Sequence, residues 1–130
     1  MRLWHYKLIK FLPNLQLMAQ WRELNSIFKN KPKHILINYI YDYSKDYLDT
    51  YTNLVLKEMN RRKINIKSMV NCKQYFGDKL YCRKYFKEHD SQYLTICYYN
   101  LKEKHLRGQK GFSAEVWNKL ENYYKQIVSR

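Results

Sequence analysis

Residues 13–24 read PNLQLMAQWREL, and this stretch predicts the first helix of an all-helical fold. Pro13 suits a first helical turn, because its ring already fixes φ near the helical value. Apolar residues then recur at helical spacing and predict the stripe that faces the core. These residues are Leu15, Met18, Trp21 and Leu24. Arg22 and Glu23 fall on faces rotated away from the stripe, so we expect them to border solvent or a ligand.

The remaining sequence predicts further helices within a single domain over residues 1–130. Only three glycines and two prolines occur, so helix breakers are few. We expect helices over residues 46–63, over 90–104 and from Ser113 onward. The expected inward residues are Leu48, Tyr51, Val55 and Met59, then Tyr93, Leu94, Cys97 and Leu101, then Val116, Trp117, Leu120, Tyr124 and Ile127. Residues 67–87 predict mostly loop, and residues 35–43 predict either buried helix or irregular chain. The expected fold class is all-α, with about four helices and long basic loops.

The charge balance indicates a polyanionic partner. The chain has 25 Lys and Arg residues against 11 Asp and Glu residues, a formal net charge of +14 at pH 7. So strong a positive field attracts nucleic acid. An anionic membrane is the less favoured alternative, since the apolar runs are only a few residues long.

The opening stretch and the cysteines indicate a reducing compartment. Residues 1–12 alternate aromatic, basic and aliphatic side chains without the apolar core of a signal peptide, so we expect a cytoplasmic protein. Cys72, Cys82 and Cys97 are odd in number and widely spaced, which favours reduced, partly buried thiols. A metal site that uses them with His89 or His105 is the less favoured alternative. We expect neither a metal nor another cofactor.

Glu23 is the most informative single residue. It is the only acidic residue before Asp42, in a region rich in cations. Those cations are Arg2, Lys7, Lys10, Arg22, Lys29, Lys31 and Lys33. Because a lone carboxylate in a phosphate-attracting region weakens DNA binding, it needs either a structural partner such as Arg22 or a chemical role.

Four segments carry a resemblance to a known family. Residues 17–24 read LMAQWREL and resemble the catalytic helix of the pyrimidine-dimer DNA glycosylase (phage endonuclease V) family. The opening residues 1–5, MRLWH, resemble the start of bacterial members. The stretches NRRKINIK at 60–67 and LKEK at 101–104 also have close counterparts. The resemblance covers about half of the chain, while residues 73–87 and those after Arg107 match poorly.

The resemblance implies a compact helical DNA-repair enzyme. In this family the N-terminal α-amine attacks C1′ of the damaged nucleotide, an imine to the opened sugar forms, and the strand is cut by β-elimination. The expected substrate is double-stranded DNA that carries ultraviolet pyrimidine dimers. An α-amine suits this task, because its ordinary pKa of roughly 7.7–8 leaves a neutral fraction that a lysine at roughly 10.4 lacks. The glutamate that matches Glu23 is catalytic.

The N-terminus departs from the family pattern. The phage enzyme loses its initiator methionine, whereas Arg2 is too bulky for ordinary methionine removal, so we expect Met1 to remain. An ungapped alignment puts the Met1 amine one residue too early, by up to about 3.8 Å. One extra residue before the helix instead aligns Met1, Arg2 and Leu3 with the nucleophile, arginine and aliphatic residue of the family. We therefore expect Met1 and Glu23 to be the catalytic residues.

The DNA-binding positions carry over unevenly. The expected DNA-binding residues are Arg2, Arg22, Lys29, Lys31, Lys33, His34 and Lys104. Ser26 and Asn100 stand where the family has arginines, so we expect Lys29 and Lys31 to take over part of the phosphate binding. His34 matches a family histidine whose role here is open between packing, phosphate contact and acid–base chemistry.

Two other functions remain open from the sequence. One is a glycosylase or lyase that acts on another modified pyrimidine or on a pre-formed abasic site. The other is a non-catalytic, basic, helical DNA-binding module in which Arg22 and Glu23 form a surface ion pair. We expect a monomer without an obligate protein partner in each case.

Overall fold

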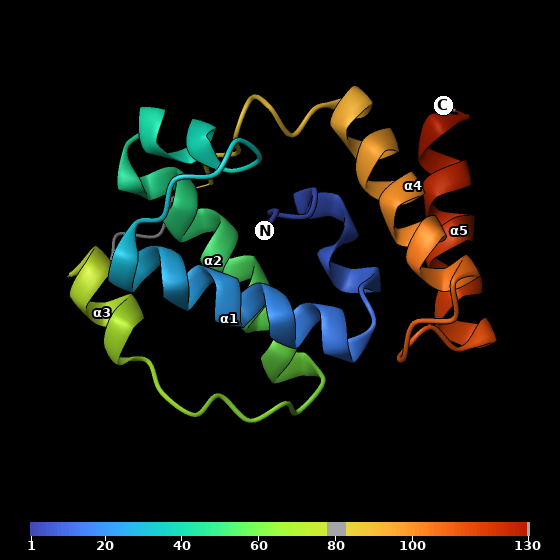
Figure 1. Cartoon of the computed structure of the whole chain (residues 1–130), viewed down its shortest axis with the longest axis horizontal. Coiled ribbons are helices and arrows are strands. Elements are labelled where there is room, and N and C mark those ends of the chain that lie inside the picture. Colours follow the sequence, from blue (N-terminus) through green and yellow to red (C-terminus); the bar gives the residue numbers. More distant parts are fainter. Residues whose placement is uncertain (78–82, 130) are drawn as a thin grey trace.

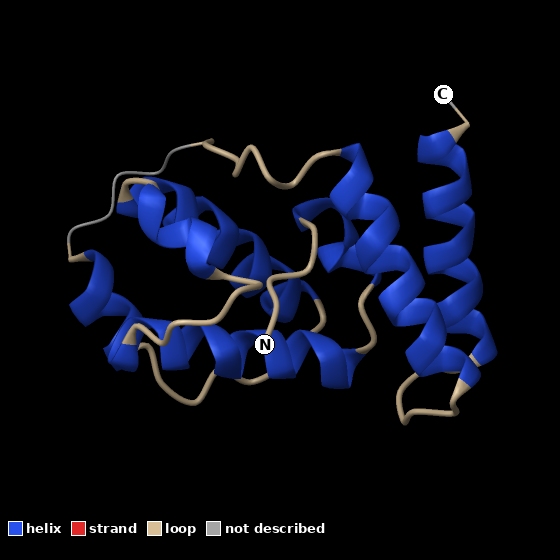
Figure 2. Cartoon of the chain, turned by 45° about the horizontal axis from the view of Figure 1, so that its top comes forward, coloured by secondary structure: helices blue, strands red, loops and turns tan. Residues whose placement is uncertain are grey.

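The described part of the chain, residues 1–77 and 83–129 of a computed structural model, folds into helices and connecting loops (Figure 1). In chain order the elements are η1 (Tyr6–Phe11), α1 (Asn14–Asn30), η2 (Asn38–Asp42), α2 (Lys45–Arg61), α3 (Val70–Phe76), α4 (Ser91–Leu106) and α5 (Ala114–Val128), where η marks a 3-10 helix. No strand occurs among these described residues (Figure 2). The all-α prediction is confirmed.

The N-terminal segment, residues 1–12, runs through the middle of the fold. Helix α1 packs against α2 and α3, helix α4 packs against α5, and η1 contacts both α2 and α5. Figure 1 shows the segment in dark blue between these two groups of helices. Four of its aliphatic side chains are fully buried, namely Leu3, Leu8, Ile9 and Leu12. The chain end is therefore part of the core and not a loose tail.

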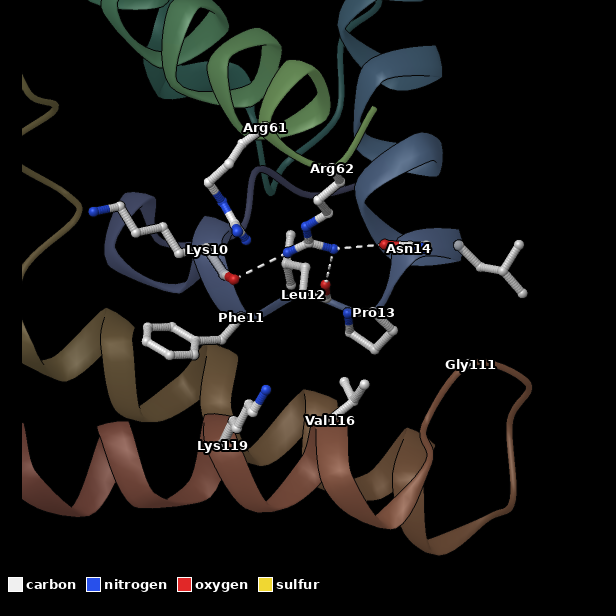
Figure 3. Close-up of a pocket in the computed structure, with 11 residues that line it drawn as sticks. Lys10, Phe11, Leu12, Pro13, Asn14, Arg61, Arg62, Gly111, Val116 and Lys119 are labelled. Carbon is white, nitrogen blue, oxygen red and sulfur yellow. Dashed lines mark hydrogen bonds between the residues drawn. The ribbon is translucent and has the colours of Figure 1, made fainter. Parts of the chain in front are cut away.

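Arg62, just after α2, fixes the C-terminal end of this segment. Its guanidinium donates to the carbonyls of Leu12 at 2.6 Å and Lys10 at 3.0 Å, and to Oδ1 of Asn14 at 2.9 Å (Figure 3). Its Nε donates to Oε2 of the buried Glu58 at 2.6 Å. Burial by itself raises the pKa of the Glu58 carboxyl, but hydrogen bonds from Arg61 and Arg62 outweigh it and the pKa is lowered. Arg62 thus donates hydrogen bonds to carbonyls at the end of η1 that have no partner within this helix.

The four predicted α-helices are all present, and most inward residues are as expected. Helix α1 begins directly after Pro13, and the Ser113 hydroxyl accepts from the backbone N–H of Val116 at the start of α5. All four expected core residues of α2 are buried. Leu94, Cys97 and Leu101 of α4, and Trp117, Leu120 and Tyr124 of α5, are buried as well, whereas Tyr93, Val116 and Ile127 are partly exposed.

The predicted core stripe of α1 is wrong at two positions. Leu15 is 49% exposed and Met18 is 36% exposed, whereas Trp21 and Leu24 are buried as expected. The buried face instead contains Gln16, Leu17, Gln20, Trp21, Leu24, Ile27 and Phe28. The reason is the N-terminal segment, which packs on the glutamine side of α1 and turns the helix away from the Leu15 edge.

Two segments were predicted less well. The region 67–87 contains the helix α3, although its other described residues are irregular. Residues 38–42 form the 3-10 helix η2, between the two predicted alternatives. Cys72 and Cys97 are buried, while Cys82 lies outside the described residues. No helix in the described ranges is long and apolar enough to cross a membrane.

Candidate active site

One cleft brings together residues from four separate parts of the chain. It has a volume of about 280 Å³ and opens beside the N-terminus. Its lining consists of Met1, Arg2 and Trp4, then Gln16, Ala19, Gln20 and Glu23 of α1, then Leu36, and finally Asn100 and Lys104 of α4. The predicted catalytic residues Met1 and Glu23 therefore share one cavity, together with the predicted DNA-binding residues Arg2 and Lys104.

Gln20 connects the chain end to the carboxylate. Its side-chain Nε2 donates to the carbonyl of Arg2 at 3.1 Å and to Oε2 of Glu23 at 3.2 Å. Its Oε1 accepts from the backbone N–H of Trp4 at 2.9 Å. Because Trp4 N–H can only donate, this contact fixes which end of the amide carries the oxygen. Gln20 is only 1% exposed, so the arrangement is rigid.

Tyr51 of α2 also holds Gln20 and the N-terminal segment in place. Its hydroxyl lies 2.7 Å from the carbonyl of Trp4 and 3.0 Å from Oε1 of Gln20, so its single proton is shared between two acceptors. Burial raises the pKa of Tyr51 well above its ordinary range, and the hydroxyl therefore stays protonated. Both backbone polar groups of Trp4 are thus hydrogen-bonded to side chains of helices α1 and α2.

Arg2 is held against aromatic rings next to Glu23. Its guanidinium carbon lies 5.8 Å from the ring centre of Trp4 and 5.8 Å from that of Tyr93. The Tyr93 hydroxyl in turn donates to the carbonyl of Leu3 at 2.6 Å. A cation over aromatic faces keeps its charge while losing part of its freedom. Arg2 is therefore a preorganised positive group at the edge of the cleft.

Two buried histidines pack behind the N-terminal segment. His89 accepts from the backbone N–H of Tyr6 through Nδ1 at 3.3 Å, and its Nε2 lies 2.7 Å from the Tyr39 hydroxyl. His5 accepts from the backbone N–H of Lys7 at 3.1 Å and caps η1. Burial lowers the pKa of His5 to about 4. The pKa of His89 is lowered to about 3, mainly by burial and to a smaller extent by repulsion from His5. Both rings are neutral at pH 7 and act as hydrogen-bonding core residues.

Glu23 has a neutral partner in place of a cation. Although Arg22 is its neighbour in sequence, no ion pair within 4 Å joins these two residues, and the hydrogen bond to Glu23 comes from the Gln20 amide. Arg22 is exposed on another face of α1, as predicted. The surface ion pair of the DNA-binding-module hypothesis is therefore absent. The Glu23 carboxylate is only partly exposed and faces the cleft.

The other predicted DNA-binding residues lie outside the cleft. Lys29, Lys31, Lys33 and His34 are all exposed, at the end of α1 and in the turn that follows it. Leu36, at the end of the same turn, reaches the cleft lining. None of these four side chains lines the cavity. Asn100, which stands where the family has an arginine, is in the wall itself.

Sequence reasoning did not identify Gln20, Tyr51 or Leu36 as parts of the site. A signal for Gln20 was present, because it lies one helical turn before Glu23 and hence on the same face of α1. Tyr51 was predicted only as a core residue. Its contact with Trp4 joins residues 47 positions apart in the chain, and no local pattern encodes such a contact.

The described residues form a helical body in which Met1 and one carboxylate, Glu23, line the same cleft. Comparison with protein families identifies the class of protein. The family model described as pyrimidine dimer DNA glycosylase matches residues 1–71, which is more than half of the chain. The chain belongs to the pyrimidine dimer DNA glycosylase family. Neither the curated proteins nor the solved structures gave a match.

Family membership identifies the protein as an enzyme of the DNA glycosylase type and DNA as its substrate. The matched region includes every cleft residue from Met1 to Leu36 and also Tyr51. Asn100 and Lys104 of α4 lie beyond it. Eight of the ten lining residues, Met1 and Glu23 among them, therefore lie in the region that the family model matches.

Proposed function

We propose that this protein excises damaged pyrimidines from duplex DNA, with ultraviolet dimers as the expected lesion, and then cuts the strand at the abasic site. The observation that carries the proposal is the cleft shared by Met1 and Glu23. A backbone amine and a carboxylate at one cavity are the two groups that an imine-forming glycosylase needs.

The first chemical step falls to the α-amine of Met1. Its nitrogen attacks C1′ of the damaged nucleotide, and the bond between C1′ and the base breaks as the new C–N bond forms. The base leaves with the bonding electrons and takes up a proton. The attached nitrogen loses a proton, and its lone pair then displaces the ring oxygen, so that the sugar opens to an iminium ion. The ring oxygen takes up a proton from solvent and becomes a hydroxyl.

Glu23 serves as charge stabiliser and proton carrier. As the base departs, positive charge develops on the sugar, and a carboxylate at the cleft wall stabilises it. Glu23 then accepts a proton from C2′, the C3′–O bond breaks, and the 3′ strand leaves as a phosphate. Hydrolysis of the imine returns the free amine. None of these steps requires a metal or a nucleotide cofactor.

The cations around the cleft suit the DNA backbone. Arg2 and Lys104 line the cavity, and Arg22, Lys29, Lys31, Lys33 and His34 are exposed along α1 and in the turn that follows it. We propose that these side chains bind phosphates and orient the lesion strand. A glycosylase for another modified pyrimidine, or a lyase for pre-formed abasic sites, would use the same amine and carboxylate. The non-catalytic module is disfavoured because Glu23 lacks the ion pair with Arg22 on which it depends.

Borohydride trapping tests the proposal. The protein is incubated with a duplex that holds one abasic site, and borohydride reduces any imine to a stable amine. We expect a covalent protein–DNA adduct whose proteolysed DNA-bearing peptide begins at Met1. Binding without an adduct would overturn the proposal and favour the DNA-binding module. Dimer-containing and abasic duplexes compared side by side then separate a dimer glycosylase from a lyase.

A further inference from the structure

The turn between α1 and η2 holds an isoleucine away from the rest of the protein. Ile35 is 86% exposed, more than any other large hydrophobic side chain in the described ranges. Single exposed apolar residues are common on protein surfaces and carry no meaning alone. Ile35 differs from them in three respects. Its turn is held by hydrogen bonds, the next residue in the chain lines the cleft, and positively charged side chains are exposed in the same turn.

The turn is fixed on the C-terminal side of Ile35. The carbonyl of His34 accepts from the backbone N–H groups of Ile37 and Asn38, both at 2.9 Å. The backbone N–H of His34 donates to Oδ1 of Asn38 at 2.8 Å, and Leu36 N–H donates to Nδ1 of His34 at 3.1 Å. Ile37 is fully buried. The backbone on both sides of Ile35 is thus tied down while its side chain is left outside.

The N-terminal side of the turn is fixed as well. Lys31 ends α1 in the left-handed conformation, with φ of 48°, and Pro32 follows it. The Tyr41 hydroxyl donates to the carbonyl of Pro32 at 2.8 Å, and the ammonium of Lys33 lies 4.5 Å from the centre of the Tyr41 ring. Residues 31–38 contain no glycine. Ile35 is therefore presented by a preorganised turn, which spares the entropy of ordering it on binding.

The position of the turn indicates the chemical character of its binding partner. Leu36, the next residue, lines the cleft that contains Met1 and Glu23. Lys31 and Lys33 are exposed in the same turn. An apolar tip beside lysines matches a partner that is anionic outside and apolar inside. Duplex DNA has this character, with phosphates on its surface and stacked bases within.

We propose that Ile35 is a wedge that inserts between stacked bases next to the lesion while the surrounding cations hold the phosphates. The inference rests on the proposed function, because it takes the cleft as the place where the lesion strand binds. Apolar side chains inserted at a base step unstack it and kink the duplex. The additional protein contacts that the bent DNA makes offset the free energy lost by unstacking. A damaged step is stacked less well than a normal one and is easier to open. Ile35 would thus help to bring the damaged sugar to the amine.

The test compares two variants on two substrates. Ile35→Ala removes the tip, and Val128→Ala is the matched control, since Val128 is an exposed β-branched residue at the end of α5. Each protein is mixed with a dimer duplex that carries 2-aminopurine beside the lesion, whose fluorescence rises when it unstacks. Cleavage of this duplex and of a pre-formed abasic duplex is measured at single turnover, and circular dichroism checks the helical fold.

We expect Ile35→Ala to lose the fluorescence rise and to cut the dimer duplex roughly tenfold more slowly. Cleavage and borohydride trapping at the abasic site should change less than about twofold, because no base remains to be removed there. Val128→Ala should behave as the wild type. An Ile35→Ala protein with a normal fluorescence rise and a normal dimer rate would overturn the wedge while leaving the proposed chemistry intact. Failure of the wild type to form any imine would instead overturn the proposed function, and the fluorescence rise would still decide the wedge.

Discussion

The Gln20 side-chain amide donates to Oε2 of Glu23 at 3.2 Å, one turn along the same helix. The same nitrogen donates to the carbonyl of Arg2 at 3.1 Å, one residue from the chain end. A neutral side chain therefore sets the distance between the proposed nucleophile and the proposed acid–base group. Among the described residues, the hydrogen bonds between residues 1–4 and α1 all involve the Gln20 side chain, so the geometry of the site depends on Gln20.

Gln20→Met should disable catalysis while keeping DNA binding. The substitution preserves volume but removes every hydrogen bond to Arg2, Trp4 and Glu23. Misplacement of reacting groups by about 1 Å can slow a reaction roughly 10²-fold, and we expect a loss of this size in the rate of imine trapping. Unpaired buried backbone groups should also lower the free energy of unfolding by about 1–3 kcal/mol. A trapping rate equal to that of the wild type in the folded variant would show that Gln20 has no positioning role.

Glu23→Gln should remove cleavage with little effect on structure. The new amide is isosteric and its oxygen still accepts from Gln20, but it can neither stabilise a cation as a carboxylate does nor accept a proton. We expect cleavage at an abasic site to fall roughly 10²–10⁴-fold, the usual contribution of a positioned acid or base. Affinity for DNA should rise slightly, because one negative charge is lost. Mass spectrometry of the intact N-terminus should accompany this measurement, and residues added before Met1 should abolish cleavage in the same assay.

Acidification should destabilise the fold through His5 and His89. Burial lowers both pKa values below the ordinary 6.5, to about 4 and about 3. The unfolded chain then binds more protons than the folded chain, so the stability that these residues contribute is complete above pH 6.5 and is lost as the pH falls through 6.5 toward those values. Between about pH 7 and 5 the free energy of unfolding should fall by roughly 2 kcal/mol for each histidine.

Urea denaturation at a series of pH values measures this effect. His89→Gln should reduce the slope of stability against pH by about half. The exposed His34 provides a control, since His34→Ala leaves the buried pair intact. An unchanged slope in His89→Gln would mean that the acid sensitivity has another origin.

Arg62→Met should destabilise the protein far more than Arg61→Ala. Arg62 is largely buried and bonds to Glu58 and to the carbonyls at the end of η1, whereas Arg61 is exposed and bonds only to Glu58 among the hydrogen bonds of the described residues. Removal of one partner from a buried pair costs about 3 kcal/mol, and an exposed pair is worth less than about 1 kcal/mol. Equal urea midpoints for the two variants would contradict the anchoring role of Arg62.

Lys33→Ala should lower the salt dependence of DNA binding. One phosphate contact contributes about one unit to the slope of log K against log salt concentration, so the slope should fall by roughly that amount and the loss of affinity should be greatest at low salt. Lys125→Ala is the control, because Lys125 lies on α5 and pairs with Glu121 at 3.6 Å. A loss of equal size at all salt concentrations would show that Lys33 does not contact phosphate.

The sequence was sufficient for the four longer helices and for placing Glu23 outside the core, but not for the way α1 faces the core. Apolar spacing predicted α2, α4 and α5 together with most of their buried residues, because these helices follow a local period. Leu15 and Met18 fit the same period and are nevertheless exposed. Gln16 and Gln20 replace them inside, since they face residues 1–12, which no helical pattern reveals.

The candidate site, like the fold, was predicted where it depends on local sequence and missed where it depends on long-range contacts. Glu23 was singled out because it is the only acidic residue before Asp42, and its predicted catalytic role came from the family resemblance. The contacts that hold Gln20 against Trp4 and Tyr51, and Tyr51 against Trp4, join residues 16 to 47 positions apart. The short helix α3 was missed because seven residues provide too few turns for a clear period.

The burial of residues 1–12 has a consequence for the order in which the protein matures. The backbone N–H of His5 donates to Sγ of Cys97, and that of Tyr6 to Nδ1 of His89, so these two residues find partners 92 and 83 positions later in the chain. During synthesis the packing of residues 5 and 6 therefore cannot be completed until α4 has been made.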